Sequence, residues 1–339
     1  MILFFRSKKM DIDVSTYTNV SFAELLAKHV QEEKNSTALV CSNGEYSWFD
    51  IEMGAQIIAE DLKKLGAEFG THIAICGANS VNWVLTFYAI QKIGAMAMLL
   101  NPSLDCEKIK ETVLAGDIEI LCYGDVRSEM NSDKFFNEIA EDNRCRNIKL
   151  YSVTKDKDIR LRFDEYNWTK TDYEHRTDSD TPCVTIFTSG STGNPKGVIL
   201  SAFNLLNASA VQVKKQQMTS GDSELLMVPL FHILGLVVCL LPCAMTSIPL
   251  FIPDDIHSET IIDMMEKYRC TLLHVVPTMM LALINSPRFD SKIFKSLRCT
   301  LFAGSASSES MLNKCIETMP SNHFIIRSIG TVTLRATRQ

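Results

Sequence analysis

One short stretch of the chain combines residue types that suit phosphate binding. The loop 188–198 lies within "CVTIFTSGSTGNPKGVILS" and separates two apolar, β-branched runs. Its small residues supply hydroxyl donors and a backbone that can approach an anion closely; they are Thr188, Ser189, Gly190, Ser191, Thr192 and Gly193. Lys196 adds a positive charge. Because each charge-assisted hydrogen bond contributes about 1.5–3 kcal/mol, this loop predicts a site for a triphosphate.

The loop does not have the spacing of a Walker A motif. Counting from Gly190, the second glycine position holds Pro195 and the Ser/Thr position holds Gly197. The residues after Lys196 also favour a strand where that motif needs a helix. The pattern therefore excludes a P-loop NTPase. A ligand-free hairpin of turn-forming residues is the alternative, and the succession of hydroxyl and glycine residues makes it the weaker one.

The elements around the loop alternate between helical and strand patterns, which predicts an α/β fold with largely parallel sheets. A hairpin is expected around Asn43-Gly44, with a second strand "YSWF". Helices are expected over 21–34, 51–66, 81–94, 106–116, 202–218, 258–270 and 308–318, with one more beginning at Pro277. Strands are expected over 71–76, 95–100, 118–124, 183–187, 197–201, 271–276 and 299–304. The polar stretch 151–180 is interpreted as a surface connection.

The composition argues for an ordinary soluble protein of more than one subdomain. The 339 residues are 46% hydrophobic and 22% charged, with a net charge of −6 and no basic block, so nucleic acid is not an expected partner. The eleven cysteines are scattered and form no Cys-x-x-Cys pair. Reduced, buried thiols are therefore favoured over a disulfide or metal framework.

Two apolar segments raise the question of membranes. The N-terminal "MILFFRSKK" has its charges after a short apolar patch, which is not the order of a signal peptide. The segment 225–252 is long and uncharged, but Pro229, Pro242 and Pro249 interrupt it, so a buried strand–helix–strand is favoured over a membrane span. A cytoplasmic location is the default, and peroxisomal targeting is considered only for a longer product.

The motif "TSGSTGNPKGV" resembles the signature loop of the adenylate-forming enzymes, the acyl-CoA synthetase, 4-coumarate–CoA ligase and luciferase group. Other stretches are also similar to that family, among them "GAMAMLLNPSL", "VPLFHILGL", "HVVPTMM" and "LFAGSAS". The likeness extends from about Ser21 to about Arg327. It implies the family's large N-terminal domain, with two mainly parallel sheets packed with helices.

The resemblance implies a two-step ligase that uses Mg²⁺ and ATP. A carboxylic acid, fatty or aryl, would form an acyl-adenylate and then a thioester with coenzyme A. It implies that residues 188–193 cradle the phosphates. It also implies two catalytic residues: Lys196, which would position the loop, and His232, which would line the acyl site. Gly304, Ser305 and Ala306 would line the adenine and acid pocket.

The resemblance also predicts how the chain is divided and where it departs from the family. We expect a tail over 1–20, subdomains over 21–180 and 181–327, and a divergent tail over 328–339, without the family's mobile C-terminal domain. Near Gly330 the family's aromatic, Thr and Glu are replaced by Ile329, Val332 and Thr333. The sequence thus predicts a truncated, catalytically impaired ligase. A non-catalytic nucleotide-binding or regulatory protein that pairs with a full-length ligase stays open, as does a membrane-associated protein.

Overall fold

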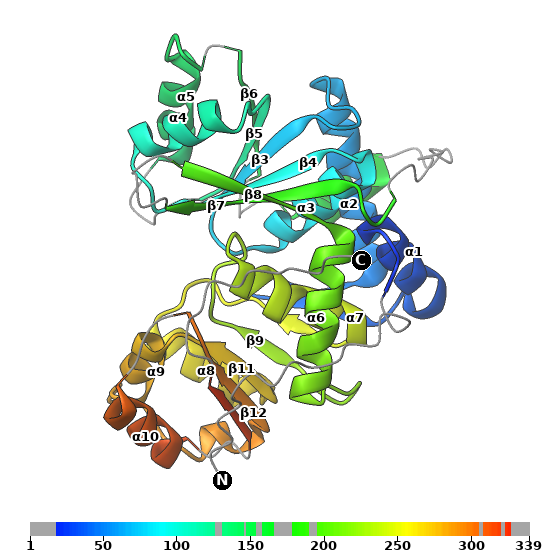
Figure 1. Cartoon of the computed structure of the whole chain (residues 1–339). Helices are drawn as coiled ribbons and strands as arrows, with labels where there is room; N and C mark the ends of the chain where they lie inside the picture. Colours follow the sequence, from blue (N-terminus) through cyan, green and yellow to red (C-terminus); the bar gives the residue numbers. More distant parts are fainter. Residues whose placement is uncertain are drawn as a thin grey trace, which may run out of the picture.

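The protein is represented by a computed structural model. It describes residues 18–125, 131–145, 147–153, 158–165, 178–189, 195–304, 308–319 and 323–326. Within these ranges the chain forms two β-sheets with helices on both faces of each (Figure 1).

The first sheet has six strands in the order β6-β5-β3-β4-β7-β8. The strands are β3 (His72–Cys76), β4 (Met96–Leu100), β5 (Ile120–Tyr123), β6 (Lys149–Ser152), β7 (Pro182–Ser189) and β8 (Pro195–Ser201). All neighbours are parallel except the β7–β8 pair, which is an antiparallel hairpin. The carboxyl ends of β3, β4, β5 and β7 therefore meet at one edge of this sheet.

The second sheet has seven described strands in the order β13-β12-β11-β9-β10-β1-β2. They are β1 (Thr37–Cys41), β2 (Gly44–Ser47), β9 (Glu224–Leu226), β10 (Leu250–Phe251), β11 (Leu272–Val275), β12 (Cys299–Phe302) and β13 (His323–Ile326). Only β1 and β2 pair antiparallel, as the expected hairpin around Asn43-Gly44. The expectation of largely parallel sheets is thus confirmed.

Ten α-helices lie in the described ranges, together with shorter helical turns. They are α1 (Phe22–Glu33), α2 (Trp48–Lys64), α3 (Val81–Ile93), α4 (Cys106–Ala115), α5 (Ser132–Glu141), α6 (Ala202–Gln216), α7 (Leu241–Thr246), α8 (Ser258–Tyr268), α9 (Pro277–Ile284) and α10 (Glu309–Thr318). The capping box of Ser21 and Glu24 that begins α1 is present as predicted.

One local expectation was wrong, and one segment contains more regular structure than its sequence indicates. The strand predicted for 46–49 ends at Ser47, because Ser47 and Asp50 form a second capping box and α2 begins at Trp48. The polar stretch predicted as a connection contains a 3₁₀ helix, η2 (Ile159–Glu165), as well as the end of β6. Contacts from arginine side chains of η2 to neighbouring elements hold this helix in place. No hydrophobic periodicity in the sequence predicts it.

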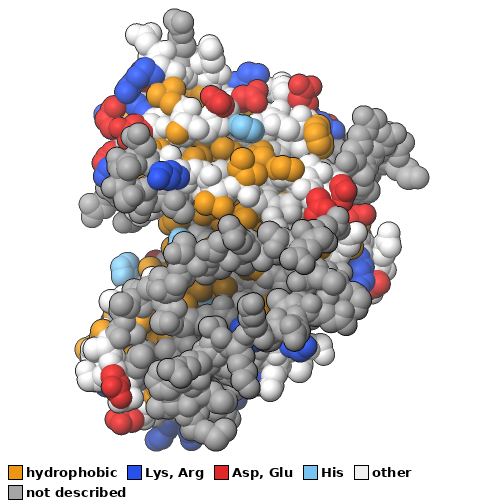
Figure 2. Space-filling model, in the orientation of Figure 1, with side chains coloured by type: hydrophobic (Ala, Val, Ile, Leu, Met, Phe, Trp, Pro, Cys, Tyr) orange, Lys and Arg blue, Asp and Glu red, His pale blue; other side chains and the backbone are white. Residues whose placement is uncertain are grey.

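The helices and sheets form five alternating layers. One core packs α4 and α5 against the outer face of the first sheet, through residues such as Ile109 and Phe136. A second core packs α8, α9 and α10 against the outer face of the second sheet. The largest core lies between the two sheets and contains α1, α2, α3, α6 and α7. In Figure 1, α6 leaves the end of β8 and runs down beside the lower sheet, and Figure 2 shows a notch between the two halves of the molecule.

The long apolar segment 225–252 folds as several short buried elements. It contains β9, a π-helix η3 (Leu234–Leu240), α7 and β10. The predicted strand–helix–strand is therefore confirmed. None of the helices in the described part of the chain combines the length and apolar character that crossing a membrane requires.

Candidate functional site

The predicted phosphate loop is framed by the β7–β8 hairpin. The register pairs Thr188 with Lys196 and Ser189 with Pro195, so the two ends of the loop lie side by side. Lys196 is exposed on β8. The side chains of Thr188 and Ser189, and the whole of 190–194, lie outside the described residues. The structure thus places the two ends of the predicted phosphate loop together at the carboxyl edge of the first sheet. In α/β proteins, this edge of a parallel sheet commonly binds ligands.

The hairpin is tightly built below the loop. A Cβ atom added to Gly197 would lie 2.8 Å from Cγ2 of Thr185 on the facing strand. Because real Cβ atoms do not approach so closely, a glycine is required here for β8 to pass β7. The glycine after Lys196 therefore has a structural role in the hairpin that frames the loop.

His232 lies in the short segment that joins β9 to η3. Its backbone N–H donates to the carbonyl of Pro229 at 3.2 Å, and its carbonyl accepts from the N–H of Leu236 at 3.0 Å. The N–H of Leu234 donates to His232 Nδ1 at 3.2 Å. Although part of the residue is exposed, desolvation by the surrounding protein lowers the pKa of its imidazole. His232 is thus held with Nδ1 as an acceptor, which favours the neutral ring.

Asn79 holds the His232 segment, and the sequence analysis missed it. Its amide Nδ2 donates to the carbonyl of Val228 at 2.9 Å, and its Oδ1 accepts from the N–H of Leu230 at 2.8 Å. Asn79 follows β3 of the first sheet, whereas Val228 and Leu230 follow β9 of the second. The asparagine therefore joins the carboxyl ends of strands from both sheets. An asparagine three residues after the end of a predicted strand was the signal that could have identified it.

Gly304 lies next to the His232 segment, although the two are far apart in the chain. It follows β12 with φ of +91°, and a Cβ added there would lie 2.8 Å from Val276 and 3.6 Å from Leu234. Both the positive φ and the close contact require glycine. Ser305 and Ala306 lie outside the described residues. Of the predicted substrate-binding residues, the structure thus brings His232 and Gly304 to one edge of the second sheet.

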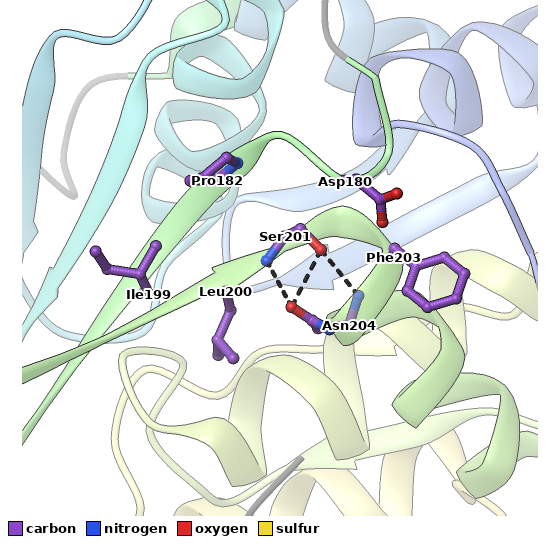
Figure 3. A pocket seen from close by; sticks show the side chains of 7 residues that line it. All are labelled: Asp180, Pro182, Ile199, Leu200, Ser201, Phe203 and Asn204. Carbon is purple, nitrogen blue, oxygen red and sulfur yellow. Dashed lines mark hydrogen bonds between the residues drawn. The ribbon is translucent and has the colours of Figure 1, made fainter. Parts of the chain in front are cut away.

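A shallow pocket lies at the opposite end of the hairpin from the phosphate loop (Figure 3). Its volume is about 360 Å³, and its lining residues are Asp180, Pro182, Ile199, Leu200, Ser201, Phe203 and Asn204. The polar groups of Ser201 and Asn204 bond to each other at 3.1–3.3 Å in the capping box of α6. The polar side chains of this pocket are thus engaged in the helix cap, and the pocket is separate from the predicted phosphate loop.

The Mg²⁺ implied by the resemblance needs oxygen ligands close to the phosphates. Among the described residues, the one group of His, Cys, Asp and Glu side chains arranged to hold a metal is Glu224, Cys239 and His274. This group is buried in the core beside the second sheet and offers sulfur and nitrogen as well as oxygen. It does not fit Mg²⁺, so the described part of the chain supplies no carboxylate set for that ion.

The five layers, with two mainly parallel sheets and helices on both faces of each, define an α/β protein. Residues 26–330 match the family model described as AMP-binding enzyme. The chain belongs to this family, the adenylate-forming superfamily, which includes acyl- and aryl-CoA ligases. The predicted family and fold are thereby confirmed.

Relatives and solved structures give the same picture. The chain is 26% identical to 4-coumarate:CoA ligase 1 of Petunia hybrida, over 90% of this chain and 55% of the ligase. It is 25% identical to 2-succinylbenzoate–CoA ligase of Listeria monocytogenes, over 86% of this chain and 56% of that protein. The chain spans about half the length of the curated relatives it matches.

Among solved structures, the inhibitor-bound N-terminal domain of FACL13 from Mycobacterium tuberculosis has a TM-score of 0.77 at 18% identity, covering 93% of this chain and 77% of that one. ATP-bound MatB from Rhodopseudomonas palustris has a TM-score of 0.76 at 19% identity, covering 91% and 60%. These likenesses establish the fold.

Proposed function

We propose that this chain binds ATP through the loop 188–198 and activates a carboxylic acid as an acyl-adenylate, the first half of an acid–CoA ligase reaction. The observation that carries the proposal is the hairpin, which brings both ends of a hydroxyl- and glycine-rich loop together beside Lys196 at the carboxyl edge of the first sheet. The ATP-bound and ligase relatives support it, since they share this fold or this family.

In this reaction a carboxylate oxygen attacks the α-phosphorus of ATP, the bond from that phosphorus to the β-bridging oxygen breaks, and pyrophosphate leaves. The loop's part is to hold the β- and γ-phosphates without offering a nucleophile. His232 and the turn at Gly304 would line the acid and adenine side; this is supported by Leu234, which lies near Gly304 and donates a hydrogen bond to His232.

The second half of the reaction is also part of the proposal: the thiol of coenzyme A displaces AMP and forms a thioester. The acid is proposed only as a class, fatty or aryl, because the residues beside His232 are apolar and have no charge to select a particular substituent. A cytoplasmic location stays a prediction.

Thermal unfolding with and without Mg-ATP tests nucleotide binding. ATP at 100 times its dissociation constant should add about 2.7 kcal/mol to the free energy of unfolding. A Lys196→Ala, Thr192→Ala double variant should lose most of this stabilisation, whereas Lys134→Ala, an exposed lysine on α5, should retain it. A cooperative transition that ATP does not shift in the wild-type chain would contradict the proposal.

Pyrophosphate exchange with a panel of carboxylic acids separates the enzyme from its alternative. Acid-dependent exchange above that of the double variant supports acyl-adenylate formation. ATP stabilisation without exchange favours the second candidate, a nucleotide-binding or regulatory protein that pairs with a full-length ligase. That candidate then predicts a saturable complex with an intact relative. We keep this candidate because the family's aromatic, Thr and Glu residues are replaced near Gly330.

A further inference from the structure

A group of metal-ligand side chains is buried away from the proposed nucleotide site. Glu224 begins β9, His274 lies on the neighbouring strand β11, and Cys239 lies in η3. The register pairs Glu224 with Leu272, two residues before His274, so both polar side chains point to the same face of the second sheet. Glu224 is 0% exposed and His274 is 1% exposed.

The hydrogen bonds of His274 define which ring nitrogen faces the group. Its Nε2 lies 2.8 Å from Oε1 of Gln216, at the end of α6. The other ring nitrogen, Nδ1, faces Oε1 of Glu224 within hydrogen-bonding distance. The imidazole and the carboxylate are thus held side by side in the core, where both are potential metal ligands.

The thiols add soft ligands to this pair. Single ligand atoms of Glu224, Cys239 and His274 all lie within 4.8 Å of one another. Cys243 lies one helical turn after Cys239, and its Sγ donates to Oε2 of Glu224 at 3.5 Å. Cys239 lies in a π-helix, a widened turn that proteins frequently use at functional positions.

We propose that Glu224, Cys239 and His274 bind a zinc-like divalent transition-metal ion, with Cys243 as the nearest fourth ligand. Bonds of about 2.0–2.3 Å to sulfur, nitrogen and oxygen are typical of zinc. Binding such an ion requires the facing atoms of Glu224 and His274 to move apart, because two ligands of one tetrahedral zinc ion lie roughly 3.3 Å from each other. The bond from Gln216 orients the imidazole from its far side, as outer hydrogen bonds do for metal-binding histidines.

The ion would be structural, because the group is buried between the second sheet and the π-helix. It would attach η3, and with it the segment that carries His232, to strands β9 and β11. Each thiol that binds loses its proton to solvent, so the charge of the ion replaces a proton in the core. This inference is independent of ATP binding.

The test is refolding of the full-length chain under reducing conditions with Zn²⁺, since a buried site must be filled during folding. After gel filtration, the metal content should be about one equivalent per chain. Cys239→Ala and His274→Gln should each lose most of it. Cys122→Ala is the matched control and should retain it, because Cys122 is equally buried in the first sheet.

Cobalt gives a second readout. Co²⁺ should replace Zn²⁺ and show a thiolate-to-cobalt absorption band that Cys239→Ala lacks and Cys122→Ala keeps. If those variants do not fold, the test uses the wild-type chain alone. Zn²⁺ should raise the midpoint of its unfolding transition, and Mg²⁺ should not. Wild-type protein refolded with Zn²⁺ that holds no metal and shows no shift would overturn the proposal and leave a hydrogen-bonded Glu224–His274 pair.

Discussion

At the scale of single residues, one arginine explains why the polar stretch before β7 contains ordered structure. Arg160 of η2 donates to the carbonyls of Asn43 and Glu45, each at 3.0 Å, and so holds the β1–β2 hairpin. Its guanidinium also bonds to Asp158 and lies 4.2 Å from the centre of the Tyr46 ring. The contacts with the hairpin join segments more than 100 residues apart, and none of them follows from local periodicity.

Replacing Arg160 should destabilise the chain. Arg160→Met keeps a long side chain but removes the hydrogen bonds and the guanidinium over the Tyr46 ring, so the free energy of unfolding should fall by about 2 kcal/mol in urea titrations. Arg288→Met is the matched control, because Arg288 and its partner Asp263 are both largely exposed, and its effect should be clearly smaller. Equal effects of the two substitutions would contradict this role for Arg160.

The pair of Arg160 and Asp158 also makes the stability of the chain depend on pH. Hydrogen bonds from Arg160 hold the pKa of Asp158 below its usual value, although partial burial opposes them. The stabilisation by the Asp158 carboxylate is therefore present above the unfolded pKa of about 3.9, and it is lost as the pH falls through the lower folded value. The stability difference between the wild type and Asp158→Asn should be constant near neutrality and shrink below about pH 4.

At the scale of elements, the π-helix η3 depends on a close approach to the turn before it. A Cβ atom added to Gly235 would lie 2.1 Å from the carbonyl oxygen of Pro229. That oxygen also accepts the hydrogen bond from the N–H of His232. The glycine therefore fixes both the start of η3 and the position of the candidate site residue beside it.

Gly235→Ala should therefore force a backbone shift, and we expect it to reduce the free energy of unfolding by about 3 kcal/mol. Gly221→Ala is the matched control. The nearest atom to a Cβ at Gly221 is 3.9 Å away, so its effect should stay within about 0.5 kcal/mol. Denaturant titration of both variants measures the difference. A Gly235→Ala protein as stable as the control would show that this turn adapts without cost.

At the scale of the whole molecule, the two sheets share one core. The central core contains Ile73 and Leu99 from the first sheet and Leu226 and Leu250 from the second. Asn79 adds a polar connection between the two sheets at their carboxyl edges. The helices between the sheets cover the inner faces of both. Because losing this layer would expose the apolar faces of both sheets, the two halves should unfold together.

We expect a single unfolding transition, with tryptophan fluorescence and circular dichroism changing together. Asn79→Ala removes two hydrogen bonds and should lower the stability by about 2 kcal/mol without splitting the transition. Asn285→Ala, at an exposed position on the outer helical layer, should have little effect. Two separated transitions in the wild-type chain would show that the halves are independently stable.

The amino-acid sequence by itself determined the alternation of strands and helices, the capping box at Ser21 and the residue types of the phosphate loop. Each of these depends on neighbours within a few positions, where periodicity and turn chemistry act directly. The tertiary structure alone decided that Glu224 lies beside His274, that Gly304 reaches Leu234, and that Asn79 bonds to residues about 150 positions away. Those contacts depend on which parallel strands become neighbours, and that order is set by packing of the shared core rather than by local pattern.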